Sequence, residues 1–258
     1  MNDNSLKFLD IGEGSDRRRI AVRTQEGSAP GVVWLGGFKS DMKGTKAQAL
    51  ADWAEQSGRG FIRFDYSGHG ESDGVFAEGT IGRWLDESLA VFDAFCHGPQ
   101  ILVGSSMGGW LTLLLTRALQ RRGAAGAGSI AGMMLIAPAV DFTEELMWKR
   151  FTPAIKQELE EKGSWSRPSE YSSEPYIITK RLIEEGRNHL LLGGMIECGC
   201  PVRILQGVAD PDVPWQHAKA LVARLACDDV VLTLVKDGDH RLSRPEDLER
   251  LTRAVAEL

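Results

Sequence analysis

Short apolar runs rich in β-branched residues alternate with longer segments of helical periodicity, and this alternation constrains the fold more than any other feature. The run at 31–37, GVVWLGG, has the length and composition of a buried strand. The segment at 80–96 places large apolar side chains at three- and four-residue steps, which is typical of an amphipathic helix. Regular strand–helix alternation predicts an α/β fold whose mostly parallel sheet is covered by helices on both faces.

The same patterns predict the other elements and show where the alternation stops. Strands are expected at 18–24, 31–37, 60–68, 100–104, 130–139, 200–207 and 230–236. Helices are expected at 45–58, 80–96, 108–123, 215–226 and 244–258. Residues 142–196 show helical and loop patterns with no convincing strand. We therefore expect a core formed by residues 1–141 and 197–258, with 142–196 inserted as a helical lid.

Length, charge and hydropathy exclude several classes of protein. The 258 residues are enough to bury a core without disulfide bonds. The formal net charge of −6 argues against a nucleic-acid-binding surface, which would be basic. No apolar run reaches the roughly 18 residues of a membrane-spanning helix, and the first residues lack the apolar core of a secretory signal.

Cysteine usage indicates the redox environment. The four cysteines, Cys96, Cys198, Cys200 and Cys227, match no common zinc or redox spacing. Reduced, packed cysteines are typical of a reducing compartment, so we expect a cytoplasmic protein. We expect no metal ion and no organic cofactor, and we leave homo-oligomerisation open.

Two adjacent serines follow the predicted strand at 100–104. The pattern G-x-S-x-G fits one register, from Gly104 to Gly108, and its central serine is Ser106 rather than Ser105. A strand before the motif and a helix after it are the context of a nucleophile elbow. A phosphate-binding loop would need the pattern G-x-x-x-x-G-K-[ST], which is absent from this sequence. The sequence therefore predicts Ser106 as a nucleophile.

A nucleophilic serine needs a histidine base, which follows the acid in the chain order of this architecture. Three histidines follow Ser106. His240 lies just after the last predicted strand, His189 lies in the insertion, and His217 lies at the start of a helix. Because sites in open α/β folds gather at the carboxyl edge of the sheet, we expect His240 to be the base. His69, which precedes the serine in a glycine-rich loop, is interpreted as structural.

The acid that orients the histidine is sought in the loop after the strand at 200–207. That loop contains Asp210 and Asp212, and we favour Asp210 because it lies three residues after Gly207, where the loop leaves the strand end. Asp212 is an alternative that would instead cap the next helix. Asp141, after the strand that ends near residue 139, is a further alternative.

The remaining site residues are expected in two places. The backbone N–H groups of Met107 and Phe38 are predicted to form the oxyanion hole, with Gly37 leaving room for the substrate. Aromatic residues of the insertion, Trp148 and Trp165 among them, are predicted to bind the substrate. Further candidates for the pocket wall are Phe142, Leu146, Phe151 and Tyr171. The alternative is that these side chains only pack the lid onto the sheet.

Six stretches together resemble one subgroup of the α/β-hydrolase superfamily. They are WLGGFKSDMKGTKA, FIRFDYSGHGESDG, GPQILVGSSMGGW, KGSWSRPSEYS, PVRILQGVADPDVPW and DGDHR. The animal members of this subgroup are mitochondrial depalmitoylating thioesterases that also hydrolyse drug acyl-glucuronides. The resemblance runs from about residue 30 to the C-terminus and implies the roles already assigned to Ser106, Asp210 and His240. The compartment is not carried over, because the first residues do not resemble a presequence.

We therefore expect a serine hydrolase that cleaves esters or thioesters of small molecules or acyl-proteins through an acyl-enzyme intermediate. An anionic leaving group such as a glucuronate would meet cations of the insertion, unless these cations form a solvated face. The cations are Lys149, Arg150, Lys156 and Arg167. A serine peptidase or amidase is the second hypothesis. A non-catalytic binding protein of the same fold is the third, although it predicts a lost triad position.

Overall fold

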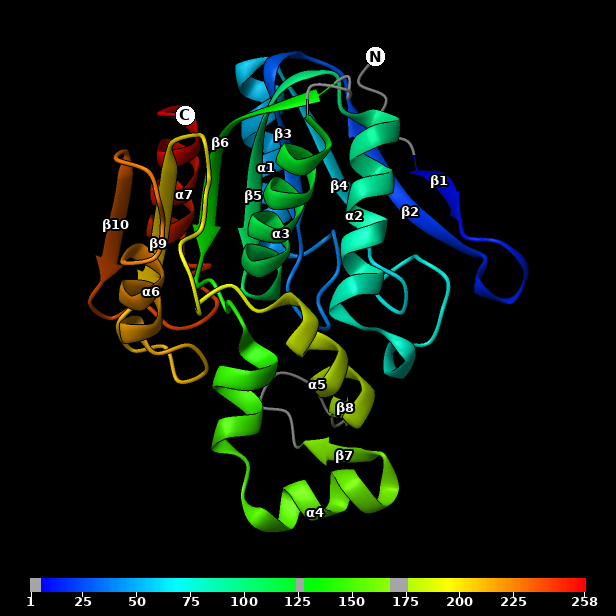
Figure 1. Cartoon of the computed structure of the whole chain (residues 1–258). Helices are drawn as coiled ribbons and strands as arrows, with labels where there is room; N and C mark the ends of the chain where they lie inside the picture. Colours follow the sequence, from blue (N-terminus) through cyan, green and yellow to red (C-terminus); the bar gives the residue numbers. More distant parts are fainter. Residues whose placement is uncertain (1–5, 124–127, 168–175) are drawn as a thin grey trace.

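An eight-stranded sheet forms the centre of the molecule (Figure 1). The computed structural model describes residues 6–123, 128–167 and 176–258. The strand order is β1-β2-β4-β3-β5-β6-β9-β10. β1 pairs antiparallel with β2, and β2 pairs antiparallel with β4. The six strands from β4 to β10 in that order pair parallel with their neighbours. The strands are β1 Leu6–Ile11, β2 Arg18–Gln25, β3 Ser28–Leu35, β4 Arg59–Phe64, β5 Gly98–Ser105, β6 Gly128–Ile136, β9 Val202–Gly207 and β10 Val230–Val235. The prediction of a mostly parallel α/β sheet is confirmed.

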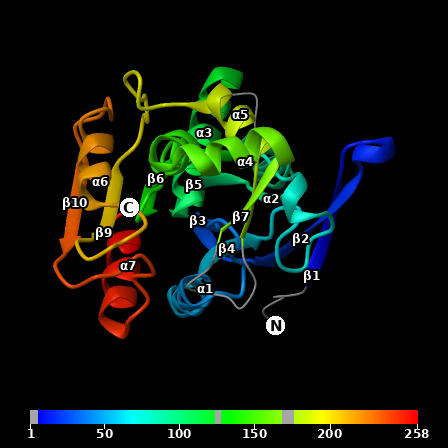
Figure 2. The ribbon, with the colours of Figure 1, turned by 90° about the horizontal axis from the view of Figure 1, so that it is seen from below.

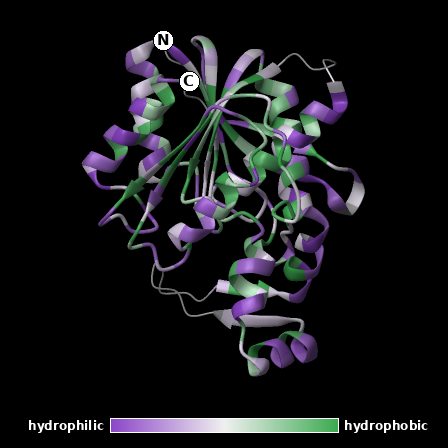
Figure 3. Cartoon of the chain, turned by 60° about the vertical axis from the view of Figure 1, so that its left-hand side comes forward, coloured by the Kyte–Doolittle hydropathy of each residue, from purple (hydrophilic) through white to green (hydrophobic). Residues whose placement is uncertain are grey.

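Helices cover both faces of this sheet and enclose two apolar cores (Figure 2). On one face lie α1 Thr45–Ser57 and α7 Pro245–Ala256. On the other lie α2 Ile81–Phe95, α3 Met107–Arg122 and α6 Trp215–Val222. The central helix α3 is buried along most of its length, as its apolar sequence predicts. Figure 3 shows hydrophobic residues concentrated on the strands and on the helix surfaces that face them.

The segment 142–196 lies between β6 and β9 in the chain, and its described residues, 142–167 and 176–196, extend beyond the carboxyl edge of the sheet (Figure 1). Their described regular elements are the short helical turns at Thr143–Met147, Trp148–Arg150 and Arg187–His189, α4 Pro153–Lys162, β7 Ser164–Arg167, β8 Tyr176–Thr179 and α5 Lys180–Gly186. β7 and β8 pair antiparallel with each other. The expectation of no strand in this segment is therefore wrong. Each strand has four residues, too few to give a clear alternating pattern.

A second element that the patterns did not predict is β1. Its six residues, LKFLDI, form an edge strand that pairs only with β2 and has three exposed and three partly buried positions without strict alternation. The remaining predicted strands and helices are present with shifts of a few residues at their ends. Among the described residues, no helix is both long enough and apolar enough to cross a membrane.

The parallel strands end at one edge, and their carboxyl-terminal loops meet there. β3 leads into the loop before α1, β5 leads into α3, and β9 and β10 lead into the loops before α6 and α7. Residues far apart in sequence are thereby brought together beneath the inserted segment, which is where sites of open α/β folds lie.

Candidate active site

The turn from β5 to α3 places Ser106 at the carboxyl edge of the sheet. Its backbone has φ 55° and ψ −117°, a region that non-glycine residues rarely adopt. The turn is closed by the Ser106 N–H, which donates to the Ile136 carbonyl at 2.8 Å, and by the Gly109 N–H, which donates to the Ser106 carbonyl at 2.9 Å. This is the geometry of a nucleophile elbow.

The glycines of the motif permit this sharp turn. A Cβ on Gly104 would lie 2.3 Å from the Gly108 carbonyl oxygen, and one on Gly108 would lie 2.0 Å from the Leu35 carbonyl oxygen. Both distances are far below contact, so strand and helix can approach this closely only with glycine at these positions. Ser105 is buried, whereas Ser106 lines a cavity. The choice between the two serines thus follows from the backbone geometry.

His240 connects Ser106 to Asp210 by two hydrogen bonds. The His240 Nε2 lies 3.0 Å from the Ser106 Oγ, and the Nδ1 lies 2.8 Å from the Asp210 Oδ2. The imidazole is partly exposed, while the Asp210 side chain is fully buried. An Nδ1–H that donates to the carboxylate leaves Nε2 as the acceptor for the serine hydroxyl. The structure therefore brings together the three residues that the sequence selects for a triad.

The carboxylate of Asp210 is held by four donors. The Oδ1 accepts from the N–H groups of Asp212 and Val213, each at 2.9 Å. The Oδ2 accepts from His240 and from the Gln206 Nε2 at 3.2 Å. Gln206 was not identified from the sequence; its position one residue before the end of β9 is the only signal that could have indicated it.

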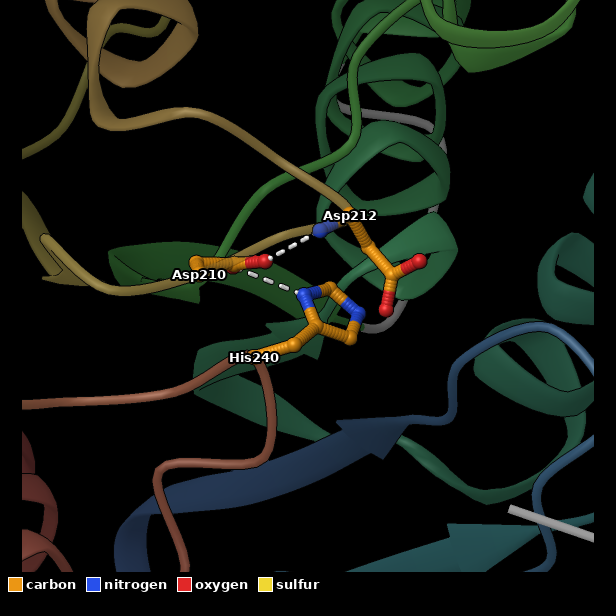
Figure 4. A group of neighbouring side chains, drawn as sticks. All are labelled: Asp210, Asp212 and His240. Atoms are coloured by element: carbon orange, nitrogen blue, oxygen red, sulfur yellow. Dashed lines mark hydrogen bonds and ion pairs between the residues drawn. The ribbon is translucent and has the colours of Figure 1, made fainter. Parts of the chain in front are cut away.

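Figure 4 shows that Asp212 also lies beside the His240 ring, so that three potential metal ligands lie within 4.8 Å of one another. The four donors to Asp210 already occupy the lone pairs that a metal ion would need. The donor set therefore suits an acid–histidine pair better than a metal site.

The other candidates for acid and base lie elsewhere in the hydrogen-bond network. Asp141 accepts from the N–H groups of Leu191 and Leu192, so it joins the two ends of the inserted segment. Burial raises the pKa of the Asp141 carboxyl. The His217 Nε2 lies 2.8 Å from the Val140 carbonyl oxygen, and burial lowers the pKa of its ring.

Two further histidines, His189 and His69, also have other partners. The His189 Nε2 lies 2.6 Å from a Glu185 carboxylate oxygen. His69 is buried, and its Nε2 accepts from the Lys39 N–H at 3.0 Å.

The two predicted oxyanion donors flank the nucleophile. Met107 is the first residue of α3, and Phe38 follows β3; both line the same cavity as Ser106. Gly37 lies against the elbow, since a Cβ there would be 3.4 Å from the Ser106 Cβ. The loop after β3 therefore passes close to the nucleophile.

A cavity of about 600 Å³ separates the nucleophile from the inserted segment. Its wall is mostly apolar and aromatic. The lining residues are Phe38, Ser106, Met107, Ala139, Phe142, Leu146, Met147, Arg150, Phe151, Ile155, Trp165, Tyr176, Pro211, Asp212, Val213 and His240. The sequence analysis did not identify Ile155, Tyr176 or Val213, and no periodic pattern marks them.

The two tryptophans predicted to bind the substrate occupy different places. Trp165 lines the cavity, and its ring packs against Phe151 at 5.3 Å. Trp148 is not among the described lining residues; its ring lies under the Lys156 and Arg187 cations, each 5.0 Å from its centre.

Of the cations expected to meet an anionic group, Arg150 lines the cavity. Lys149 instead pairs with Glu145 at 2.6 Å. The side chain of Arg167 and the whole of Tyr171 lie outside the described residues.

Lys46 supports the loop of His240 from α1, a contact that the sequence analysis did not predict. Its Nζ donates to the carbonyl of Arg241, the residue after the histidine. Burial, with the neighbouring Arg241 charge, lowers the pKa of this ammonium to about 8. The GTKA segment is thereby connected to the site.

Comparison with known proteins identifies relatives over nearly the whole chain. A family model described as serine aminopeptidase, S33 matches residues 32–247. The mouse protein named palmitoyl-protein thioesterase ABHD10, mitochondrial, is 37% identical, with 98% of this chain and 82% of that protein covered. Its human counterpart is 36% identical, with 98% and 80% covered.

Solved structures agree with the sequence comparison. A putative hydrolase from Agrobacterium vitis is 51% identical, with a TM-score of 0.96 and 98% of both chains covered. The structure of mouse α/β hydrolase domain-containing protein 10 is 37% identical, with a TM-score of 0.86 and 98% and 97% of the chains covered.

The relatives overturn one expectation. The expected cytoplasmic location is wrong on this comparison, because the mouse and human proteins are both named as mitochondrial. Free cysteines report a reducing environment rather than a particular compartment, so cysteine usage could not separate the two.

Proposed function

Because this chain belongs to the α/β-hydrolase family that the serine aminopeptidase S33 model describes, we propose that it hydrolyses carboxylic esters and thioesters with Ser106 as nucleophile. The observation that carries the proposal is the hydrogen-bonded series from Ser106 through His240 to Asp210. A serine hydroxyl is a weak nucleophile until an oriented base accepts its proton. This series supplies the base and the group that orients it.

Acylation begins when the Ser106 Oγ bonds to the carbonyl carbon of the substrate. The hydroxyl proton passes to the His240 Nε2, and the buried Asp210 carboxylate stabilises the resulting imidazolium. The carbonyl electron pair moves to oxygen, where the N–H groups of Phe38 and Met107 act as the oxyanion hole. Collapse of this intermediate breaks the bond to the alcohol or thiol, which receives the proton from His240.

Deacylation repeats these steps with water as the nucleophile. His240 takes a proton from the water as the oxygen bonds to the acyl carbon, and returns it to the Ser106 Oγ as that ester bond breaks. The residues described here account for each proton transfer, so the mechanism requires no additional group.

The inserted segment at 142–196 acts as a lid over the acyl site in this proposal. The apolar wall formed by residues such as Phe142, Leu146 and Trp165 suits a hydrocarbon acyl chain. The name of the mouse relative, palmitoyl-protein thioesterase, supports a long acyl thioester as the substrate class. Arg150 gives the same cavity a place for an anionic leaving group, as in an acyl-glucuronide.

Covalent labelling tests the nucleophile. A fluorophosphonate probe should label the wild-type protein on the peptide that contains Ser106, and the label should be absent from Ser106→Ala. Ser105→Ala is the matched control and should retain labelling, because Ser105 is buried behind the elbow. Undiminished labelling of Ser106→Ala would exclude the assignment.

A serine peptidase or amidase is the second candidate, and the description of the matching family model favours it. The two functions differ in the bond cleaved. The protein should hydrolyse palmitoyl thioesters and p-nitrophenyl esters faster than matched anilides. The ratio of these rates should exceed the ratio for uncatalysed hydrolysis of the same compounds. Comparable rates on an anilide would support the amidase.

A further inference from the structure

Two residues of the DYSGHGESDG segment hold the loop that carries Phe38. The Lys39 N–H donates to the His69 Nε2 at 3.0 Å, and the Met42 N–H donates to the Asp65 Oδ1 at 2.6 Å. Two side chains of the loop after β4 therefore accept hydrogen bonds from backbone N–H groups of the loop after β3. The predicted oxyanion donor, the N–H of Phe38, lies one residue before the first of these contacts.

The backbone at Lys39 requires such support. Its φ is 57°, in the left-handed region that costs a residue with a Cβ roughly 1 kcal/mol or more. The Ser40 N–H donates to the Gly37 carbonyl at 3.1 Å, so residues 37–40 form a tight turn with Lys39 at its third position. The hydrogen bond to His69 fixes the peptide plane between Phe38 and Lys39. The φ and ψ torsions of Phe38 connect this plane to the preceding peptide plane, which contains the Phe38 N–H.

His69 is arranged to accept this bond. The ring is 4% exposed, and its Nδ1 lies 3.2 Å from the Ser67 carbonyl oxygen. Because a carbonyl can only accept, Nδ1 carries the proton and Nε2 presents its lone pair to Lys39. The ring packs edge-on against Tyr66, Phe76 and Trp84, with centroids 5.1–5.6 Å apart.

The surroundings also keep the ring neutral. Burial, together with the charge of the Lys39 ammonium, lowers the pKa of His69 to about 4. Lys39 and Tyr66 are the titratable groups that face the ring in the contacts described, and the pKa of the buried Tyr66 hydroxyl is raised well above its ordinary value. The Tyr66 hydroxyl therefore stays neutral at neutral pH and supplies no negative charge that would favour a protonated ring.

We propose that His69 is a positioning residue of the oxyanion hole, which orients the Phe38 N–H by accepting the hydrogen bond of the Lys39 N–H. The inference rests on the proposed function, because the hole acts only if Ser106 forms a tetrahedral adduct. It assigns a role to a histidine that does not itself line the described cavity wall.

The test compares two substitutions at one position. His69→Leu removes the acceptor, whereas His69→Gln retains one, since the Gln Oε1 reaches the position of Nε2. His97→Gln, at an exposed histidine before β5, is the matched control. All rates are divided by the folded fraction of each protein, measured by circular dichroism, because fluorophosphonate labelling itself uses the oxyanion hole.

Two inhibitors separate a positioning role from a structural one. A trifluoromethyl ketone with an apolar chain forms a hemiketal: the Ser106 Oγ bonds to the carbonyl carbon, the hydroxyl proton goes to His240, and the oxyanion enters the hole. An ether of the same chain length binds the cavity without forming an oxyanion.

His69→Leu should lower kcat and weaken the ketone by about 10- to 100-fold each, with KM and ether affinity within about threefold of wild type. His69→Gln should recover at least about tenfold of the lost kcat, and His97→Gln should match wild type. The proposal is overturned if His69→Leu keeps wild-type kcat and ketone affinity, or if ether and ketone weaken equally. A wild-type protein that neither labels nor turns over esters would instead refute the proposed function, and the inference with it.

Discussion

Backbone strain in this molecule is concentrated in the loops at the carboxyl edge of the sheet, where Ser106, Asp210 and His240 lie. Among the described residues, five non-glycine positions have positive φ: Lys39, Ser106, Ala137, Asp141 and Leu242. All five lie in loops or turns after β3, β5, β6 and β10, at the carboxyl edge of the sheet. Strained residues persist where surrounding contacts hold them, and they cluster at functional sites. The strain therefore supports the placement of the active site independently of the triad motif.

Of the candidate acids, Asp210 and Asp212 both lie near His240, and substituting each of them should have a different effect on kcat. Asp210→Asn should lower kcat about 10³- to 10⁴-fold, because an asparagine amide favours the wrong tautomer of His240. Asp212→Asn should cost at least about 100-fold less, since it leaves the hydrogen bond between the His240 Nδ1 and Asp210 in place. Steady-state kinetics on a p-nitrophenyl ester measures both. Equal losses, or a larger loss for Asp212→Asn, would reassign the acid.

The buried ring of His69 makes stability depend on pH. Its pKa is lowered from 6.5 to about 4. Between these pH values the unfolded chain binds a proton that the native protein does not, so the free energy of unfolding falls as the pH falls. The contribution of the neutral, buried ring to the free energy of unfolding is fully present above pH 6.5. About 3 kcal/mol of this free energy is lost by pH 4. Urea unfolding of wild type and His69→Gln from pH 7 to 4 measures it. The variant should lose less stability on acidification, and identical pH dependence would contradict the assignment.

At the scale of elements, the inserted segment contributes its tryptophans unequally to the cavity. Trp165 lines the wall, whereas Trp148 lies between two cations elsewhere. Trp165→Ala should lower kcat/KM at least about tenfold for a palmitoyl ester, because it removes a large apolar contact, and should change acetyl ester hydrolysis less than about threefold.

Trp148→Ala is the matched control for that change. It removes the same side chain from the same segment, so it should leave the ratio of palmitoyl to acetyl activity within about twofold of wild type. A larger loss of chain-length preference in Trp148→Ala than in Trp165→Ala would show that the acyl group binds outside the cavity described here.

The core elements were predictable from sequence, whereas several features of the insertion were not. β5 and α3 carry strong apolar patterns, and the glycines around Ser106 fix the turn between them. His240 and Asp210 then follow from the order of strands, since parallel strands end at one edge. Trp148 and Trp165 could not be distinguished, because their directions depend on tertiary contacts of short irregular turns and a four-residue strand. Gln206 and Lys46 act through side-chain hydrogen bonds that leave no periodic signal.

At the scale of the whole molecule, a buried ion pair joins the antiparallel edge of the sheet to the α2 layer. Arg18 of β2 donates to Glu87 of α2, and their side chains are 5% and 0% exposed. The second oxygen of Glu87 accepts the Ser67 N–H at 2.8 Å. The pair therefore also holds the segment that contains His69.

Breaking this pair on one side should destabilise the entire fold. Glu87→Leu leaves a buried guanidinium without its main partner and should reduce the free energy of unfolding by about 3–5 kcal/mol. Arg18→Met combined with Glu87→Leu should recover a large part of that loss, since the buried Arg18 guanidinium is then removed together with its partner. Urea unfolding of Arg18→Met, Glu87→Leu and the double variant measures the coupling. Additive losses would show that the two groups do not act as a pair.

Rapid-quench mass spectrometry of the protein mixed with a palmitoyl thioester tests the central claim most directly. The account predicts a transient palmitoyl adduct on the peptide that contains Ser106, formed at a rate consistent with turnover and absent from Ser106→Ala. Steady turnover with no adduct at Ser106, or equal turnover by Ser106→Ala, would contradict it.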